Sequence, residues 1–240
     1  MSQETIVPTH VNADRTRAAL VHGALAPWQR SPEPGVERRL LERIGGELAL
    51  ATSIVRYAPR SRFAAHEHGL GEEFLVLEGT FSDEHGHYPA LTYVRNPPGS
   101  RHAPFSDDGC IIFVKLRQME PTDRHAVHAF ARGRVWQRMG PAREVCVLHQ
   151  ADGRLVQLER LGRGGELPLG RDDAAQEVFV VDGDGVLHDG AATSALQRWS
   201  WLRRPQRAEA RIASAGGALL WTQRGHLPPD DAIAAARQAT

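Results

Sequence analysis

The chain has 240 residues, and its 29 lysine and arginine residues balance 29 aspartate and glutamate residues. A net charge of zero argues against a nucleic-acid binder that works by bulk charge, because such domains are usually basic with a clustered patch. Hydrophobic residues make up 41% of the chain, but no apolar run approaches the ~18 residues of a membrane span. With two cysteines and no visible signal peptide, we expect a cytoplasmic protein without membrane or nucleic-acid partners.

Short runs rich in β-branched and aromatic residues follow one another along the chain, separated by glycine and proline residues. Examples are residues 52–57, 73–77, 111–116 and 177–181. Short strands at regular spacing with turn signals between them predict an all-β sandwich or barrel. Helical periodicity is weak, so only minor helices are expected, and the best candidates are residues 13–24 and 229–238.

The second half of the chain repeats the first. Collinear matches join residues 28–116 to residues 136–224, with slips where turns are expected. The clearest are Trp28-Gln29-Arg30 with Trp136-Gln137-Arg138, the run 73–79 with 177–183, and the run 109–113 with 217–221. We therefore predict two tandem barrels over 1–120 and 134–240, joined by a linker over 121–133. The two barrels are expected to pack together as an intramolecular pseudo-dimer, and a further homodimer stays open.

Residues typical of a metal site lie in the first repeat. His66, His68 and Glu72 share parity, so an unbulged stretch with a tight turn directs all three to one face, whereas Glu73 is expected to point outward. A proline-glycine turn then leads to His102. Three imidazoles and a carboxylate suit borderline divalent metals such as Zn, Fe(II), Mn, Ni or Cu. By contrast, His85 and His87 fall at a predicted hairpin turn, where exposed side chains are the simpler interpretation.

The pattern His66-x-His68-x3-Glu72-x6-Gly79, followed by Pro97-x-Gly99-x2-His102, is similar to the two conserved cupin motifs. Over roughly residues 25–118 the chain resembles the ChrR-type cupin, the sensory domain of an anti-sigma factor that responds to singlet oxygen. The resemblance implies a double-sheet jelly-roll barrel. It also implies one zinc ion per chain, with iron, manganese or nickel as alternatives, held by His66, His68, Glu72 and His102.

Two features depart from that family. The second motif usually ends in asparagine four positions after its histidine, and Ser106 stands there in this chain. The anti-sigma factor also has a helical N-terminal domain with a His-x3-Cys-x2-Cys zinc motif, which this sequence lacks. Sigma-factor binding is therefore not expected.

The second repeat has lost the candidate ligands. Shifting the four positions by the local offsets gives a set without histidine: Gly170, Asp172, Gln176 and Ala210. We expect a degenerate, metal-free cupin retained for packing. The alternative is a metal-free small-molecule pocket that uses Arg203, Glu177 or Trp201.

Two functions of different class follow from these features. The first is a metal-binding sensor or binding module, with zinc closed by four protein ligands and a small molecule or oxidative stress as its signal. The alternative is a metal-dependent dioxygenase of the β-diketone- or flavonol-cleaving type, in which substrate and O₂ occupy open positions. Catalytic residues are not identified by the sequence. Cys110 is expected to be a buried, inert thiol, because a redox-sensing role requires partial exposure and a lowered pKa.

Overall fold

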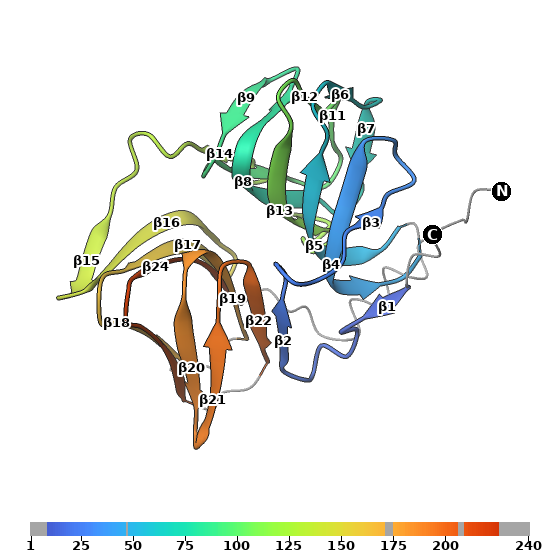
Figure 1. Cartoon of the computed structure of the whole chain (residues 1–240). Coiled ribbons are helices and arrows are strands. Elements are labelled where there is room, and N and C mark those ends of the chain that lie inside the picture. The colour runs from blue at the N-terminus through green and yellow to red at the C-terminus, as the bar shows by residue number, and fades with distance from the viewer. Residues whose placement is uncertain (1–8, 47, 171–174, 206–208, 226–240) are drawn as a thin grey trace.

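The computed structural model describes residues 9–46, 48–170, 175–205 and 209–225, and all regular elements in these ranges are β-strands. The predicted all-β class is therefore confirmed, and two barrel-like units lie side by side (Figure 1). The helix expected over 13–24 does not form: this segment contains turns and strand β2 (Ala19–His22), because strand pairing overrides a weak helical pattern. The helix expected over 229–238 lies outside the described residues. No helix in the described ranges is long and apolar enough to span a membrane.

The first unit is built on an antiparallel sheet with strand order β1-β4-β5-β13-β8-β10-β14. The long strand β8 continues beyond this sheet to pair with β9 and β12, and β7 pairs with β11. The strands are β1 (His10–Val11), β3 (Gln29–Arg30), β4 (Val36–Ile44), β5 (Leu50–Tyr57), β6 (Ser61–Arg62), β7 (His66–His68), β8 (Glu72–Asp83), β9 (Gly86–Pro89), β10 (Tyr93–Asn96), β11 (Ser100–His102), β12 (Phe105–Ser106), β13 (Cys110–Leu116) and β14 (Val127–Ala129).

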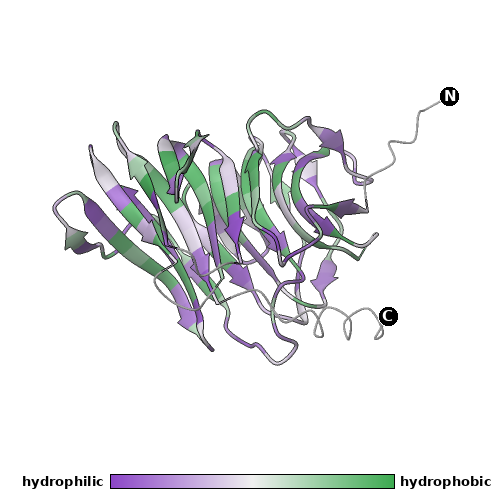
Figure 2. Cartoon of the chain, turned by 90° about the horizontal axis from the view of Figure 1, so that it is seen from below, coloured by the Kyte–Doolittle hydropathy of each residue, from purple (hydrophilic) through white to green (hydrophobic). Residues whose placement is uncertain are grey.

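The second unit has one sheet with strand order β15-β16-β17-β24-β19-β22-β2 and another with order β18-β23-β20-β21. The strands that follow β14 in the chain are β15 (Gln137–Gly140), β16 (Arg143–Ala151), β17 (Arg154–Leu161), β18 (Gly165–Leu169), β19 (Gln176–Gly183), β20 (Gly185–Asp189), β21 (Ala192–Leu196), β22 (Ser200–Arg204), β23 (Ala210–Ser214) and β24 (Ala218–Arg224). Apolar and polar segments alternate along the strands of both units (Figure 2), as expected for strands with one buried face.

The two units share strand order, register and β-bulges. The order β4-β5-β13-β8-β10 of the first unit recurs as β16-β17-β24-β19-β22 in the second. Each sheet skips one residue at two equivalent places, at Leu41 and Leu77 in the first unit and at Leu148 and Val181 in the second. All four bulged residues pack into one hydrophobic core between the units. The bulges therefore bend both sheets where they face each other.

The units exchange edge strands. Strand β2 lies between β1 and β3 of the first unit in sequence, yet it pairs with β22 of the second unit, with Val21 opposite Trp201. Strand β14 lies in the segment expected to be a linker, and it pairs with β10 of the first unit, with Ala129 opposite Tyr93. In Figure 1, β2 lies along the edge of the second unit beside β22. Each repeat thus supplies the edge strand of the other repeat's sheet.

The core between the units is rich in aromatic side chains. The ring of Phe113 stacks on that of Phe179 at a centroid distance of 4.2 Å and meets Trp221 edge-on at 5.0 Å. Separate clusters fill the interior of each barrel. Consequently the predicted packing of two barrels as a pseudo-dimer is seen directly, with a shared apolar interface.

Buried polar pairs accompany this apolar core and follow the same pseudo-symmetry. Lys115, the only lysine of the chain, forms an ion pair with Glu177 across the interface. At the equivalent place, the Gln223 side chain donates a hydrogen bond to Glu73 at 2.9 Å. Glu73 was expected to point outward, and it does point away from the candidate ligands, but it is 3% exposed because the second barrel covers that face.

Candidate metal centre

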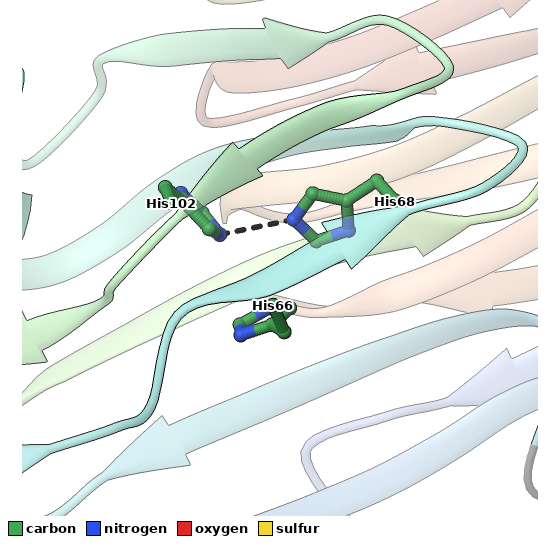
Figure 3. A group of neighbouring side chains, drawn as sticks. All are labelled: His66, His68 and His102. Atoms are coloured by element: carbon green, nitrogen blue, oxygen red, sulfur yellow. Dashed lines mark hydrogen bonds between the residues drawn. The ribbon is translucent and has the colours of Figure 1, made fainter.

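Strands β7 and β11 bring together the histidines of the two sequence motifs. His66 lies opposite His102 in this antiparallel pair, and His68 lies opposite Ser100. Because side chains alternate along a strand, His66 and His68 project from the same face of β7. The three imidazole rings lie close together, with ring centroids 4.8–5.1 Å apart (Figure 3).

The spacing of the imidazole nitrogens suits a divalent metal. One ring nitrogen from each of the three histidines lies within 4.8 Å of the others, and the Nε2 atoms of His68 and His102 are 3.0 Å apart. Zinc–nitrogen bonds of about 2.0–2.1 Å in a tetrahedral site place neighbouring ligand atoms roughly 3.3 Å apart. The ring planes are inclined to one another by 71–76°, so each imidazole approaches from a different direction.

Glu72, at the start of β8, brings a carboxylate oxygen to the same place. Its Oε2 atom is 3.4 Å from Nε2 of His68 and 3.6 Å from Nε2 of His102. Glu72, His68 and His102 are buried, whereas His66 is exposed. The structure therefore brings the three sequence-predicted histidines together, with Glu72 beside His68 and His102 and with His66 exposed to solvent.

Three further groups hold these residues in place, and sequence reasoning missed all of them. Nδ1 of His102 is 3.2 Å from Oδ2 of Asp83, and Nδ1 of His66 is 3.1 Å from the backbone oxygen of Ala64. The side-chain amide of Asn96 donates to Glu72 at 3.2 Å. In metal sites such partners fix the tautomer and orientation of the ligands. For Asn96, the only sequence feature that pointed to the site is its position directly before the Pro97 turn.

Asp83 reaches the centre because β8 bends. The ladder between β8 and β13 is interrupted by the bulge at Leu77, and Gly79 follows with φ of +70°. A Cβ atom at Gly79 would collide with the carbonyl oxygen of Gly109, so only glycine fits at this bend. As a result Glu72 and Asp83, at opposite ends of β8, lie at the two nitrogens of the same His102 ring.

The protonation equilibria of the two buried histidines differ. Burial lowers the pKa of His68 below its ordinary value, although the charge of Glu72 opposes this shift. Burial also acts to lower the pKa of His102, but the hydrogen bond to Asp83 and the charges of Glu72 and Asp83 outweigh it and raise that pKa. A metal ion bound at Nε2 of His102 would have to replace a proton that the surrounding carboxylates favour.

The remaining candidates of the first repeat are not ligands in this arrangement. Cys110 is 4% exposed, and burial raises the pKa of its thiol to about 11, which matches the expected inert thiol and not a redox sensor. His85 and His87 are exposed on the hairpin between β8 and β9, as expected. Ser106, which stands in place of the usual asparagine, is buried and donates a hydrogen bond to the backbone oxygen of Thr80.

The described residues of the second barrel form an aliphatic interior. Of the positions equivalent to the ligands, Gln176 accepts a hydrogen bond from the backbone of Gly170, Ala210 pairs with Leu169, and residue 172 lies outside the described ranges. The interior is filled by the buried residues Leu161, Leu167, Leu169, Val178, Val180, Leu187, Leu196, Leu202, Ile212, Ala218 and Leu220.

The side chains suggested for an alternative small-molecule pocket, Arg203, Glu177 or Trp201, are taken up in the interface between the barrels. All three side chains are buried between the barrels and bonded to protein groups. Arg203 pairs with Glu42 and donates to backbone oxygens of the N-terminal segment, while Trp201 donates to Glu177 at 3.4 Å.

A comparison with protein-family models shows what the first barrel is similar to. Residues 16–120, which contain all four candidate ligands, match the model of the ChrR cupin-like domain. This part of the chain is similar to a ChrR cupin-like domain. The predicted resemblance is thereby confirmed for the first repeat. No curated protein matches the chain at a significant level.

Solved structures with the same fold extend over both repeats. The protein YlbA from Escherichia coli has a TM-score of 0.69 at 11% identity, with 92% of this chain and 96% of that chain covered. The pirin YhhW from E. coli, in complex with nickel(II), has a TM-score of 0.65 at 14% identity and covers 89% and 100% of the two chains. A salicylate 1,2-dioxygenase from Pseudaminobacter salicylatoxidans has a TM-score of 0.59 at 12% identity, with 93% and 88% covered. At these identities the comparison shows that the two barrels share their fold with these proteins, and no more.

Proposed function

We propose that the protein binds one divalent metal ion, with zinc favoured, in its first barrel through His66, His68, Glu72 and His102. The observation that carries this proposal is the convergence of four donor groups, with a further hydrogen-bonding group behind His66, Glu72 and His102. Side chains that merely fill a core do not need such support, whereas metal ligands commonly have it.

We further propose that this centre serves binding or sensing, with a small molecule or oxidative stress as the signal. A zinc ion with four protein ligands has no open coordination position, so it lacks the bound water of a catalytic site. The second barrel supports this view, because its aliphatic interior and shared interface give it a packing role next to the single centre.

A dioxygenase is the second candidate, and one observation favours it. His66 is exposed, so a small molecule or O₂ has a path to the metal position from solvent. A metal ion with an added open position would then act as Lewis acid and template. The two buried carboxylates described at the centre already have a partner. Glu72 faces the metal position, and Asp83 bonds His102.

Oxygen consumption separates the two candidates. Protein freed of metal, loaded anaerobically with Fe(II) and exposed to O₂, is mixed with acetylacetone as a β-diketone or with quercetin as a flavonol. For a binding or sensing protein we expect no O₂ uptake above that of the His102→Ala variant treated in the same way. Uptake that requires both the added compound and His102 would contradict the sensing proposal and establish the dioxygenase.

A further inference from the structure

The carboxylate of Asp83 occupies an unusual position for a residue at a hairpin turn. Asp83 is 5% exposed, and its Oδ2 atom lies 3.2 Å from Nδ1 of His102, which is 3% exposed. Nε2 of the same imidazole faces Glu72. Asp83 therefore contacts the ring on the side opposite the metal position, as carboxylates behind metal-ligating histidines do.

Several bonds fix the position of this carboxylate. Its Oδ1 atom accepts hydrogen bonds from the backbone of His85 at 2.8 Å and of Gly86 at 3.2 Å. The hydroxyl of Tyr88, on β9, donates to the same oxygen at 3.1 Å. One oxygen of Asp83 is thus held by the hairpin and Tyr88, and the other is left for His102.

Tyr88 extends this contact to the other repeat. Its ring lies 5.2 Å from that of His128 and stacks on that of Phe130 at 6.1 Å, with 25° between the ring planes. His128 lies on β14, and Phe130 follows it directly. Strand β14 of the second repeat corresponds to β2 of the first. Strand β14 pairs with β10, and β2 pairs with β22, which is the equivalent strand of the other unit. A continuous series of side chains therefore leads from His102 through Asp83 and Tyr88 to the exchanged strand.

We propose that Asp83 is a positioning residue for the metal centre, which orients His102 and, through Tyr88, transmits occupancy of the centre to β14. This inference rests on the proposed metal-binding function. Metal binding would then affect a distant part of the chain. An ion that orders His102 and Asp83 also tightens the contact between Tyr88 and strand β14, which the second repeat contributes. The exposed part of this contact is Phe130, which is 44% exposed and offers a surface that changes with metal loading.

The test compares wild type with Asp83→Asn. Asparagine keeps an oxygen for the hairpin bonds but removes the charge from His102. We expect the Kd for Zn²⁺, measured by competition with a chromophoric chelator, to weaken about 10–100-fold. We also expect the visible spectrum of the Co²⁺-loaded protein to shift. In wild type, Zn²⁺ is expected to slow hydrogen exchange of the β14 amides, and Asp83→Asn and Tyr88→Phe are both expected to lose this effect.

Glu84→Gln is the matched control, because it removes the charge of the neighbouring residue. The Glu84 side chain is exposed, and it accepts a hydrogen bond from the backbone of Ala103 and does not bond the His102 ring. It should keep the wild-type Kd within about threefold, well short of the loss expected at a histidine-supporting carboxylate. If wild type binds Zn²⁺ and Asp83→Asn binds it equally well, the positioning role is overturned while the metal site stands. If β14 exchange is unaffected by Zn²⁺ in wild type, the transmission to β14 is overturned. Failure of wild type itself to bind Zn²⁺ would contradict the proposed function.

Discussion

Replacing His102 with alanine is expected to remove nearly all bound metal from the chain. Loss of a supporting residue behind a ligand costs about 10–100-fold in affinity, so loss of the ligand itself is expected to cost at least about 100-fold. The second repeat offers no substitute, since its equivalent positions carry no histidine. Elemental analysis of the purified variant measures this directly. Thermal unfolding is a second readout, because Zn²⁺ at 100 times its Kd stabilises the folded wild type by about 2.7 kcal/mol.

His85→Ala is the control for this experiment. His85 belongs to the second His-x-His sequence of the first repeat, but its side chain is exposed on the hairpin after β8. We expect this variant to retain the metal content of wild type and the stabilisation by Zn²⁺. A full metal equivalent in His102→Ala, or equal losses in both variants, would mean that the assigned ligands are wrong.

Replacing Phe113 with alanine is expected to destabilise both barrels together, by about 3–5 kcal/mol. Its ring is 1% exposed and packs on Phe179 and Trp221 of the other unit, so the variant leaves a cavity in the shared core. Because each repeat supplies an edge strand to the other sheet, we expect a single unfolding transition in urea, seen equally by tryptophan fluorescence and far-UV circular dichroism.

The matched control is Phe130→Ala, which truncates a ring that is 44% exposed. A substitution near the surface is expected to change the free energy of unfolding by about 0.5 kcal/mol. Two separate transitions in wild type, or a loss below about 1 kcal/mol for Phe113→Ala, would show that the units are not held together by this core.

The repeat and the four candidate ligands were accessible from the sequence for physical reasons. Strand residues recur at nearly constant offsets, because slips are tolerated only where turns connect strands, and the ladders of the two sheets confirm those offsets. His66, His68 and Glu72 lie within seven residues, so strand periodicity relates the two histidines and one tight turn adds Glu72. His102 required the second motif, and the pairing of β7 with β11 explains why it belongs with them.

Other features depend on tertiary contacts that local patterns do not encode. Strand β14 has three residues within a segment rich in turn signals, and only its pairing with β10 makes it a strand. Parity predicts which way Glu73 points but not that a second barrel covers that face. Asp83 is eleven positions from Glu72 along β8, and only the bend at Gly79 brings both carboxylates to the His102 ring.

The metal content of the untagged wild-type protein, from cells grown with ample zinc and iron, tests the central claim most directly. The account predicts about one divalent ion per chain, because the described residues hold one group of three clustered histidines, with Glu72 beside two of them, in the first barrel. Zinc is the ion expected, retained through mild chelation. Protein that carries no divalent metal and takes up none when Zn²⁺, Fe²⁺, Mn²⁺ or Ni²⁺ is supplied would contradict it.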